Sequence, residues 1–306
     1  MMIRHAVLQL KPKKGHVQDN IERVGQVLRE IRGHRPDVVV LPEAFLSGYF
    51  LQGGVREVAL TQAELSAAMS ALYDSLAWDG PLDVVLGFYE QDSGIYYNSA
   101  AYLELGGRGL LNVHRKVFLP TYGVFDEERY ISRGNRVEAF DTRFGRVALL
   151  ICEDFWHSVT GMIAALDGAD ILYVPSASPA RGFAGAEPAN VARWKSLTQA
   201  TAAEHGVYVV LSSLVGLEAG KGLVGGSVIT GPEGNLLGAA PVFEEAVLLG
   251  DIDLARIAPV RYNNPLLADM EAGMPLLMND LERVMAGLKV LSKNPRPLRG
   301  KELARG

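Results

Sequence analysis

The residue with the clearest chemical potential is Cys152, the single thiol among 306 residues. It ends a fully apolar run, Val147 to Ile151, and is followed by Glu153 and Asp154. A lone free cysteine is usually a small buried hydrophobe. However, a side chain at the carboxyl end of a buried strand, just before a helix, lies where α/β sheets place ligands, and the helix offers N–H groups to a developing negative charge. From its position alone, Cys152 is equally compatible with a buried packing role and with the role of a nucleophile.

Two charged residues lie in similarly apolar surroundings. Glu43 follows the run Val38 to Leu41 after one proline, and Lys116 lies within His114 to Pro120. A carboxylate is costly to bury unless it is paired or shares a proton, and a proton-sharing carboxylate suits a general base. An ammonium beside a thiol favours the thiolate and could stabilise an oxyanion. The alternatives are a loop or capping glutamate and a surface cluster of basic residues.

Taken together and in this order, Glu43, Lys116 and Cys152 resemble the nitrilase superfamily of carbon–nitrogen hydrolases. The likeness covers about Arg4 to Asp253. The segments that carry it are Leu41–Tyr49, Tyr97–Ala100, His114–Pro120, Phe140–Val147, Leu150–Asp154, Gly168–Asp170, Glu204–Val209, Gly225–Ser227 and Gly231–Gly234. Because so many matched segments follow one another in the family's order, the signal is stronger than any short motif.

The resemblance implies an architecture and a role for each of these residues. The fold would be α/β, a four-layer α-β-β-α sandwich with mixed sheets, and homodimers would be the usual building block. Cys152 would attack an amide-like carbon while Glu43 moves the protons. Lys116 and the backbone N–H of Glu153 would hold the oxyanion, and a thioester would form and then be hydrolysed.

The family also uses a second glutamate that holds the lysine and helps to position the substrate. Glu127 matches it best, within a Glu-x-Arg-Tyr pattern, and Glu128 is the alternative assignment. Further residues beside the motifs could line the substrate pocket, although core or rim packing explains them equally well. These candidates are Tyr49, Tyr122, Glu153, Phe155, Trp156 and Ser178.

A closer likeness is to the glutaminase domain of glutamine-dependent NAD synthetases. It is carried by Leu119–Tyr130, Cys152–Asp154 and Ala177–Pro179. Those enzymes continue into an ATP-using synthetase domain, whereas these 306 residues contain no Gly-x-x-x-x-Gly-Lys-Ser/Thr loop. Glu204-His205 also departs from the family's common Glu-Asn. We therefore expect a free-standing relative that cleaves an ω-amide or small amide. A glutaminase subunit that supplies ammonia to a partner synthetase, an N-carbamoyl amidohydrolase and a nitrilase are alternatives.

The elements that must position these residues are strands and helices in alternation, which predicts α/β layering. Two runs, Tyr96–Leu103 and Leu110–His114, flank a glycine-rich turn at 106–109 and predict a hairpin, so the sheets should be mixed. The predicted helices are Ile21–Ile31, Leu65–Leu76, Val159–Leu166 and Asn190–His205. The predicted strands are His5–Leu10, Asp37–Leu41, Val84–Phe88, Ala100–Leu103, Arg146–Ile151, Asp170–Val174, Val207–Leu211, Gly226–Thr230 and Ala246–Ile252.

Composition and motif searches set other functions aside. A net charge of −5 does not favour nucleic acid, and no apolar run approaches the roughly 18–20 residues of a membrane helix. One cysteine excludes an internal disulfide and fits a reducing, cytoplasmic location. There is no Gly-x-Ser-x-Gly elbow and no histidine pair at i, i+4, so we expect neither a serine triad nor a metal, and no cofactor. Gly220–Gly225 matches the dinucleotide fingerprint by letter, but a strand follows it.

Two segments carry further expectations. Residues 1–253 should form the hydrolase domain, and 254–306 a C-terminal arm with a helix near Leu277–Leu291. We predict that this arm packs on a partner subunit, and a loosely ordered tail is the alternative. The loop Ala180–Glu187 should border the pocket. Its Arg181 could bind a substrate carboxylate or could be a solvated loop arginine.

Overall fold

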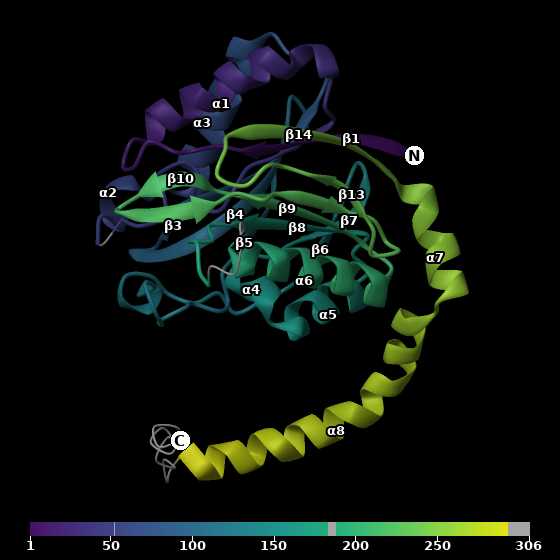
Figure 1. The fold of residues 1–306 in the computed structure, drawn as a ribbon. Coiled ribbons are helices and arrows are strands. Elements are labelled where there is room, and N and C mark those ends of the chain that lie inside the picture. The colour runs from purple at the N-terminus through teal and green to yellow at the C-terminus, as the bar shows by residue number, and fades with distance from the viewer. Residues whose placement is uncertain (52, 183–187, 293–306) are drawn as a thin grey trace. The chain divides into compact units, whose positions relative to one another are not determined.

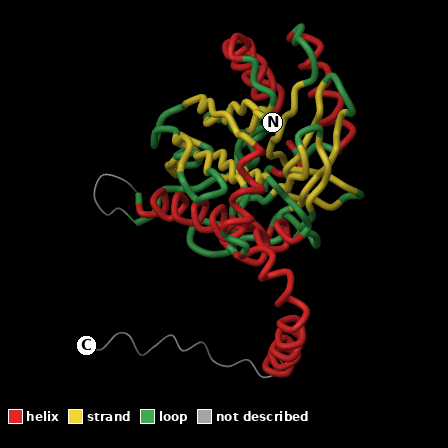
Figure 2. The backbone as a smooth tube through the Cα atoms, turned by 90° about the vertical axis from the view of Figure 1, so that its right-hand side faces the viewer, coloured by secondary structure: helices red, strands yellow, loops and turns green. Residues whose placement is uncertain are grey.

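The computed structural model describes residues 1–51, 53–182 and 188–292. The chain forms two compact units, Met1–Asn264 and a second one that begins at Pro265. The first unit contains two six-stranded sheets and a separate two-stranded hairpin. Figure 1 shows the sheets lying between two sets of helices, and Figure 2 shows the same layers after a quarter turn.

Both large sheets are mixed, as predicted, and both place three parallel strands at the centre. The first sheet consists, in spatial order, of β14 (Ala246–Asp253), β1 (Met2–Gln9), β2 (Val38–Val40), β3 (Leu82–Asp92), β4 (Ile95–Leu105) and β5 (Gly109–Arg115). The second consists of β13 (Leu236–Ala239), β12 (Val228–Thr230), β9 (Tyr208–Ser213), β8 (Ile171–Ser176), β7 (Gly145–Leu149) and β6 (Ala139–Thr142). The predicted hairpin is β4–β5.

Helices cover the outer faces of the sheets. The first sheet carries α1 (Val17–Ile31), α2 (Val55–Val58) and α3 (Gln62–Leu76), and the second carries α4 (Glu153–Trp156), α5 (Ser158–Leu166) and α6 (Ala189–His205). Helix α7 (Ile257–Asn263) ends the first unit, after the short turn η3 (Leu254–Arg256). Another short turn, η1 (Arg32–His34), follows α1. The predicted α-β-β-α sandwich is confirmed.

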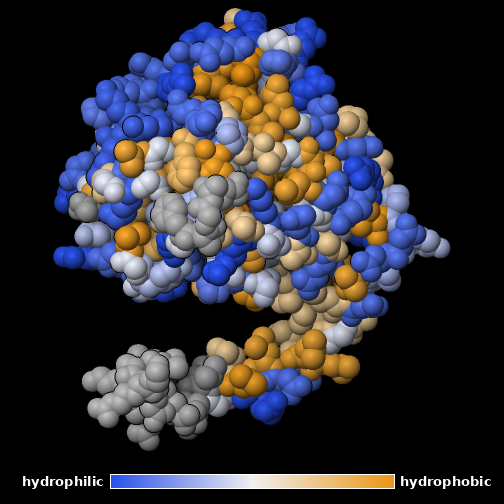
Figure 3. All heavy atoms as spheres, viewed as in Figure 1, coloured by the Kyte–Doolittle hydropathy of each residue, from blue (hydrophilic) through white to orange (hydrophobic). Residues whose placement is uncertain are grey.

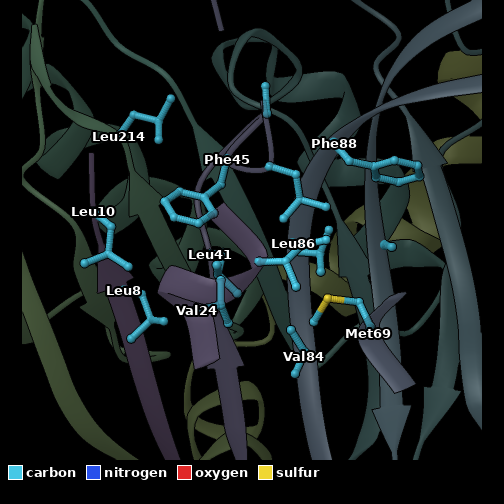
Figure 4. Close-up of a cluster of buried hydrophobic side chains, with 14 of the residues drawn as sticks. Leu8, Leu10, Val24, Leu41, Phe45, Met69, Val84, Leu86, Phe88 and Leu214 are labelled. Atoms are coloured by element: carbon cyan, nitrogen blue, oxygen red, sulfur yellow. The ribbon is translucent and has the colours of Figure 1, made fainter. Parts of the chain in front are cut away.

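The core beneath α1 and α3 shows why these sequences fold as they do. The apolar stripes predicted from 3.6-residue spacing, for example Val24 of α1 and Met69 of α3, face alternate strand residues such as Leu8 and Val84. Figure 4 shows these side chains meeting in one cluster. Their burial removes apolar surface from water, which is the main favourable contribution to folding, and it leaves the strand ends free to carry polar groups.

Short elements were the ones that the sequence patterns did not reveal. Strands β6 and β13 and the hairpin of β10 (Val215–Glu218) and β11 (Lys221–Val224) were not predicted. The dinucleotide-like glycines lie in and beside this hairpin, so the rejection of that fingerprint is confirmed. The helix predicted at Val159–Leu166 is α5, which begins at Ser158, and α4 is a further, unpredicted helical turn that begins directly after Cys152.

The second unit contains one long helix, α8 (Leu266–Ser292), which has Pro275 inside it. It includes the predicted helical stretch. Apolar side chains on it are exposed, among them Leu276 at 75% and Leu277 at 58%, and Figure 3 shows them as a run of orange along the helix. Among the described residues, no helix is long and apolar enough to cross a membrane. The boundary between the two units lies at 264/265. That residues 254–306 pack on a partner subunit stays a prediction.

Candidate active site

Lys116 forms the centre of a buried ionic cluster just beyond the end of β5. Its side chain is fully buried, and its Nζ donates to Oε1 of Glu43 at 2.7 Å and to Oε1 of Glu127 at 2.7 Å. Glu43 follows β2, and Glu127 opens the short turn η2 (Glu127–Arg129). The carboxyl groups of Glu43, 73 positions before Lys116, and Glu127, 11 positions after it, therefore meet at one ammonium group.

The turn that presents Glu43 needs a glycine on the neighbouring strand. Beyond β2 the chain stays bonded to β3, through Leu41 N to Val85 O at 2.8 Å and Gly87 N to Pro42 O at 3.2 Å. A Cβ on Gly87 would lie only 2.6 Å from Cα of Glu43. Any other residue at position 87 would therefore push the carboxylate away from Lys116.

Each carboxylate of the cluster has one occupied and one open oxygen. Asn98 donates to Oε1 of Glu43 at 2.8 Å, and the hydroxyl of Tyr49 donates to Oε1 of Glu127 at 2.5 Å. Oε2 of Glu43 and Oε2 of Glu127 are buried and have no hydrogen-bond partner among the described residues. A buried oxygen without a donor is a ready acceptor for a proton or a substrate N–H.

The cluster is built to keep Lys116 charged. Burial opposes the charge, but Glu127 and Glu43 outweigh it, so the pKa of Lys116 is raised well above its usual value. Burial raises the pKa of Glu127 to about 7, although Lys116 works in the opposite direction. The site thus combines a permanent cation with a carboxyl group that titrates near neutral pH.

Cys152 lies at a strained turn between β7 and α4. Its φ of 44° is unusual for a residue with a Cβ, and its side chain is 6% exposed. Its N–H donates to Pro175 O at 3.0 Å, and Ser176 Oγ donates to Sγ at 3.4 Å. Burial raises the pKa of the thiol, and Glu43 adds to this effect while Lys116 opposes it. The thiol therefore needs a base to take its proton.

Asp154 was not singled out from the sequence as a site residue, yet it joins the two key segments. Its fully buried carboxylate accepts from the backbone N–H groups of Val117 and Phe118, each at 2.9 Å, and from that of Ile151 at 3.1 Å. It also contacts Nε2 of His114 at 2.8 Å. A carboxylate two residues after a predicted nucleophile and directly before two aromatic residues was the available signal.

The structure distinguishes the two candidates for the second glutamate. Glu127 contacts Lys116, whereas Glu128 is 43% exposed and pairs with Arg133. The geometry therefore favours the predicted Glu127 over the alternative Glu128.

The predicted substrate contacts fall into two groups. Tyr122 donates to both carboxylate oxygens of Glu153 at 2.9 Å, and the guanidinium of Arg181 lies 5.7 Å from the centre of the Tyr122 ring. Tyr122 thus lies between Arg181 and Glu153, the residue that follows Cys152 in the sequence. Phe155 and Trp156 instead contact Trp194 of α6, with ring centres 6.2 Å and 5.2 Å apart.

Ser178 is 2% exposed and accepts from Asn190 Nδ2 at 2.8 Å. Substrate contacts by all these residues stay a prediction. The part of the predicted pocket loop at 183–187 lies outside the described residues.

A cavity of about 260 Å³ adjoins Glu127 and Tyr49. Its wall is mostly aromatic and apolar, and its charged residues are Asp126, Glu127 and Lys221. It is lined by Tyr49, Phe50, Leu51, Val55, Tyr89, Val124, Phe125, Asp126, Glu127, Tyr130, Ile131 and Lys221. Within the described ranges, no group of three or more His, Cys, Asp or Glu side chains could hold a metal ion.

Comparison with known proteins shows which proteins this chain resembles. The family model described as carbon-nitrogen hydrolase matches residues 4–262. A glutamine-dependent NAD(+) synthetase from Rhodobacter capsulatus is 33% identical over 253 residues, which is 82% of this chain and 43% of that protein. This chain thus spans less than half the length of that relative.

A nitrilase from Pyrococcus abyssi is 27% identical over 273 residues, which is 86% of this chain and 94% of that protein. Among solved structures, the carbon-nitrogen hydrolase from Helicobacter pylori G27 is similar, with a TM-score of 0.80 and 27% identity. The match covers 90% of this chain and 99% of that one.

Proposed function

Because this chain belongs to the carbon–nitrogen hydrolase family and is a hydrolase of carbon–nitrogen bonds, we propose that it cleaves a non-peptide amide through a thioester on Cys152. The observation that carries the proposal is the cluster in which Lys116 bonds both Glu43 and Glu127. Both Glu43 and Lys116 also act electrostatically on the thiol of Cys152. A base, a cation and a nucleophile are the parts that this chemistry needs.

In the first step the thiol proton moves to Glu43, whose Oε2 has no other partner in the described structure. The sulfur forms a bond to the carbonyl carbon, and the electron pair of the C=O bond moves to the oxygen. An ammonium has three N–H donors, and Lys116 uses two of them on Glu43 and Glu127. The third, with the backbone N–H of Glu153, would stabilise the oxyanion.

In the second step the tetrahedral intermediate collapses. The C–N bond breaks, the leaving nitrogen takes the proton from Glu43, and ammonia or an amine departs. A water molecule then gives a proton to Glu43 and attacks the thioester carbon. The C–S bond breaks, the sulfur recovers the proton, and a carboxylic acid leaves. One buried carboxylate thus both accepts and returns the proton in each half of the reaction.

The polar group of Tyr122, Glu153 and Arg181 supports an ω-amide of an α-amino acid as substrate. Glu153 offers a carboxylate to an ammonium group, and Arg181 offers a guanidinium to a carboxylate. The guanidinium of Arg181 also lies over an aromatic ring, 5.2 Å from the centre of the Phe125 ring. The likeness to glutamine-dependent synthetases agrees with this class of substrate.

A substrate panel read by ammonia release tests the proposal. Glutamine and asparagine, aliphatic amides, N-carbamoyl amino acids and nitriles would be compared, with the Cys152→Ala protein as the control for each. We expect release from ω-amides and none from the control. If the control releases ammonia as fast as the wild type, the proposed nucleophile is wrong.

A second candidate is a glutaminase subunit that delivers ammonia to a partner synthetase, since the synthetase relative is more than twice the length of the matched region. Adding cell extract to the same assay distinguishes the two cases, because a partnered glutaminase would gain activity from it. We further propose a cytoplasmic homodimer, supported by the single cysteine and by the family resemblance. Sedimentation analysis of the purified chain would test the dimer.

A further inference from the structure

The hairpin of β10 and β11 lies between two segments that flank the site. Its turn, Ala219–Gly220, has φ of 50° and 74°, and Glu218 pairs with Lys221 across it. Two successive residues with positive φ form the tight turn that matches the natural twist of paired strands. The hairpin is therefore a defined structural element rather than a loose loop.

One strand of the hairpin holds the segment that follows β8. Val224 N donates to Ser178 O at 3.0 Å, and Ala180 N donates to Gly222 O at 2.8 Å. This segment leads from Ser176, which contacts the thiol of Cys152, to Arg181. The hairpin thereby fixes one wall of the site.

The other strand holds the segment that starts at Glu43. The buried carboxylate of Glu218 accepts a hydrogen bond from the backbone N–H of Phe50. Gly48 makes room for it, because a Cβ on Gly48 would lie 3.1 Å from Oε2 of Glu218, and its φ of 82° also favours glycine. The backbone here is shaped to admit this side chain.

Tyr49, the residue before Phe50, connects this segment to the ionic cluster. The hydroxyl of Tyr49 donates to Oε1 of Glu127, the same oxygen that accepts from Lys116. The segment is also held by Tyr89, whose hydroxyl donates to Tyr49 O at 2.9 Å, and nearer Glu43 by Asn20, whose Nδ2 donates to Leu46 O at 2.9 Å. A shift of the segment would move the Tyr49 hydroxyl away from Glu127.

We propose that Glu218 is a positioning residue of the active site, which acts through Tyr49 on Glu127 and Lys116. This inference rests on the proposed function of that cluster. Burial raises the pKa of Glu218, although backbone hydrogen bonds from Phe50 and Tyr49 and the charges of Lys14 and Lys221 lower it. Burying the Glu218 carboxylate is costly, and it is buried where it anchors the segment that carries Tyr49.

The test compares three substitutions. Glu218→Ala removes the acceptor, Glu218→Asp keeps the charge but shortens its reach, and Glu218→Gln keeps an oxygen that can accept from Phe50 N–H. We expect Ala and Asp to lower kcat by about 10- to 100-fold with a smaller change in KM, because small displacements of reacting groups are costly. Glu218→Gln should recover most of the rate.

A readout that needs no substrate separates this inference from the proposed function. The rate of Cys152 alkylation by iodoacetamide, followed by intact mass across pH, reports the electrostatics of the cluster. Glu218→Ala and Glu218→Asp should shift its pH dependence, and Tyr49→Phe should shift it in the same way. In the double variant with Tyr49→Phe, Glu218→Ala should add no further shift.

Three outcomes would overturn the role of Glu218. They are additive effects in the double variant, a wild-type alkylation profile in Glu218→Asp, or a loss of thermal stability in Glu218→Ala with an unchanged profile. Ammonia release that persists in Cys152→Ala would instead overturn the proposed function, and the alkylation comparison in proteins that retain Cys152 would still decide on Glu218.

Discussion

Lys116 and Glu127 form a buried ion pair, with Nζ 2.7 Å from Oε1, and Tyr49 donates to the same carboxylate oxygen. Both partners lie almost entirely out of water, where an unpaired charge would be strongly unfavourable. Because Glu43 accepts from the same Nζ, one ammonium contacts two carboxyl groups. The arrangement keeps the cation in place and leaves one oxygen of each acid open.

The thiol should be indispensable. Cys152→Ala should lower turnover by roughly 10⁴-fold or more, as expected for loss of a nucleophile. In the wild type, a good substrate should leave an acyl group on Cys152 that is visible as added mass on the intact protein. Circular dichroism would show that the Ala variant is folded. Full activity in that variant would refute the thioester.

Removing the central cation should be strongly destabilising. Lys116→Met leaves Glu43 and Glu127 buried without their shared partner, so the free energy of unfolding at pH 7 should fall by about 3–5 kcal/mol. The matched control is Lys13→Met, which removes an ion pair between side chains that are 60% and 45% exposed. We expect that control to change stability by less than about 1 kcal/mol. If Lys116→Met and Lys13→Met lower the free energy of unfolding in urea by the same amount, the cluster is not buried as described.

Glu127 should make stability depend on pH. Its pKa is raised from 4.5 to about 7 on folding, so it contributes stability while it is neutral and loses that contribution as the pH rises through the folded value. As the pH rises from about 4.5 to about 7, the wild type should lose about 3 kcal/mol of unfolding free energy relative to Glu127→Gln. Denaturant unfolding of both proteins at pH 4.5 and pH 8 measures the difference. A constant difference would contradict the shift.

Asp154 should hold the Lys116 and Cys152 segments together. Asp154→Asn replaces one acceptor oxygen by a donor that faces other donors, so we expect a loss of about 2–3 kcal/mol in unfolding free energy. The activity should fall mainly in kcat, since Lys116 and the thiol would separate. Asp141→Asn is the control, because that side chain is 76% exposed. Unchanged kcat in a destabilised Asp154→Asn protein would limit its role to folding.

Arg181 should discriminate between classes of substrate. Arg181→Met removes the donor proposed for a substrate carboxylate, so KM for glutamine should rise about 10- to 100-fold. KM for a simple aliphatic amide should stay the same. Arg129→Met is a suitable control, since Arg129 also lies over an aromatic ring, at 5.5 Å from that of Tyr130. A parallel rise for both substrates would exclude carboxylate recognition by Arg181.

Much of the fold could be predicted from local patterns. Spacing of 3.6 residues identified α1 and α3, and apolar runs identified the central strands, because burial on one or both faces imposes a periodicity on the chain. Strands β10 and β13 escaped detection because each contains a glycine and neither forms the continuous apolar run that revealed the still shorter β2.

The sequence by itself determined that a thiol, an ammonium and a carboxylate each follow or interrupt an apolar segment, and its resemblance suggested a common role. Only the tertiary structure decided that Glu127 rather than Glu128 meets Lys116. It alone revealed that Asp154 joins two segments and that Glu218 reaches Phe50, 168 positions away. The physical reason is that hydrogen bonds between distant segments depend on sheet register and turn geometry, which impose no local pattern on the residues involved.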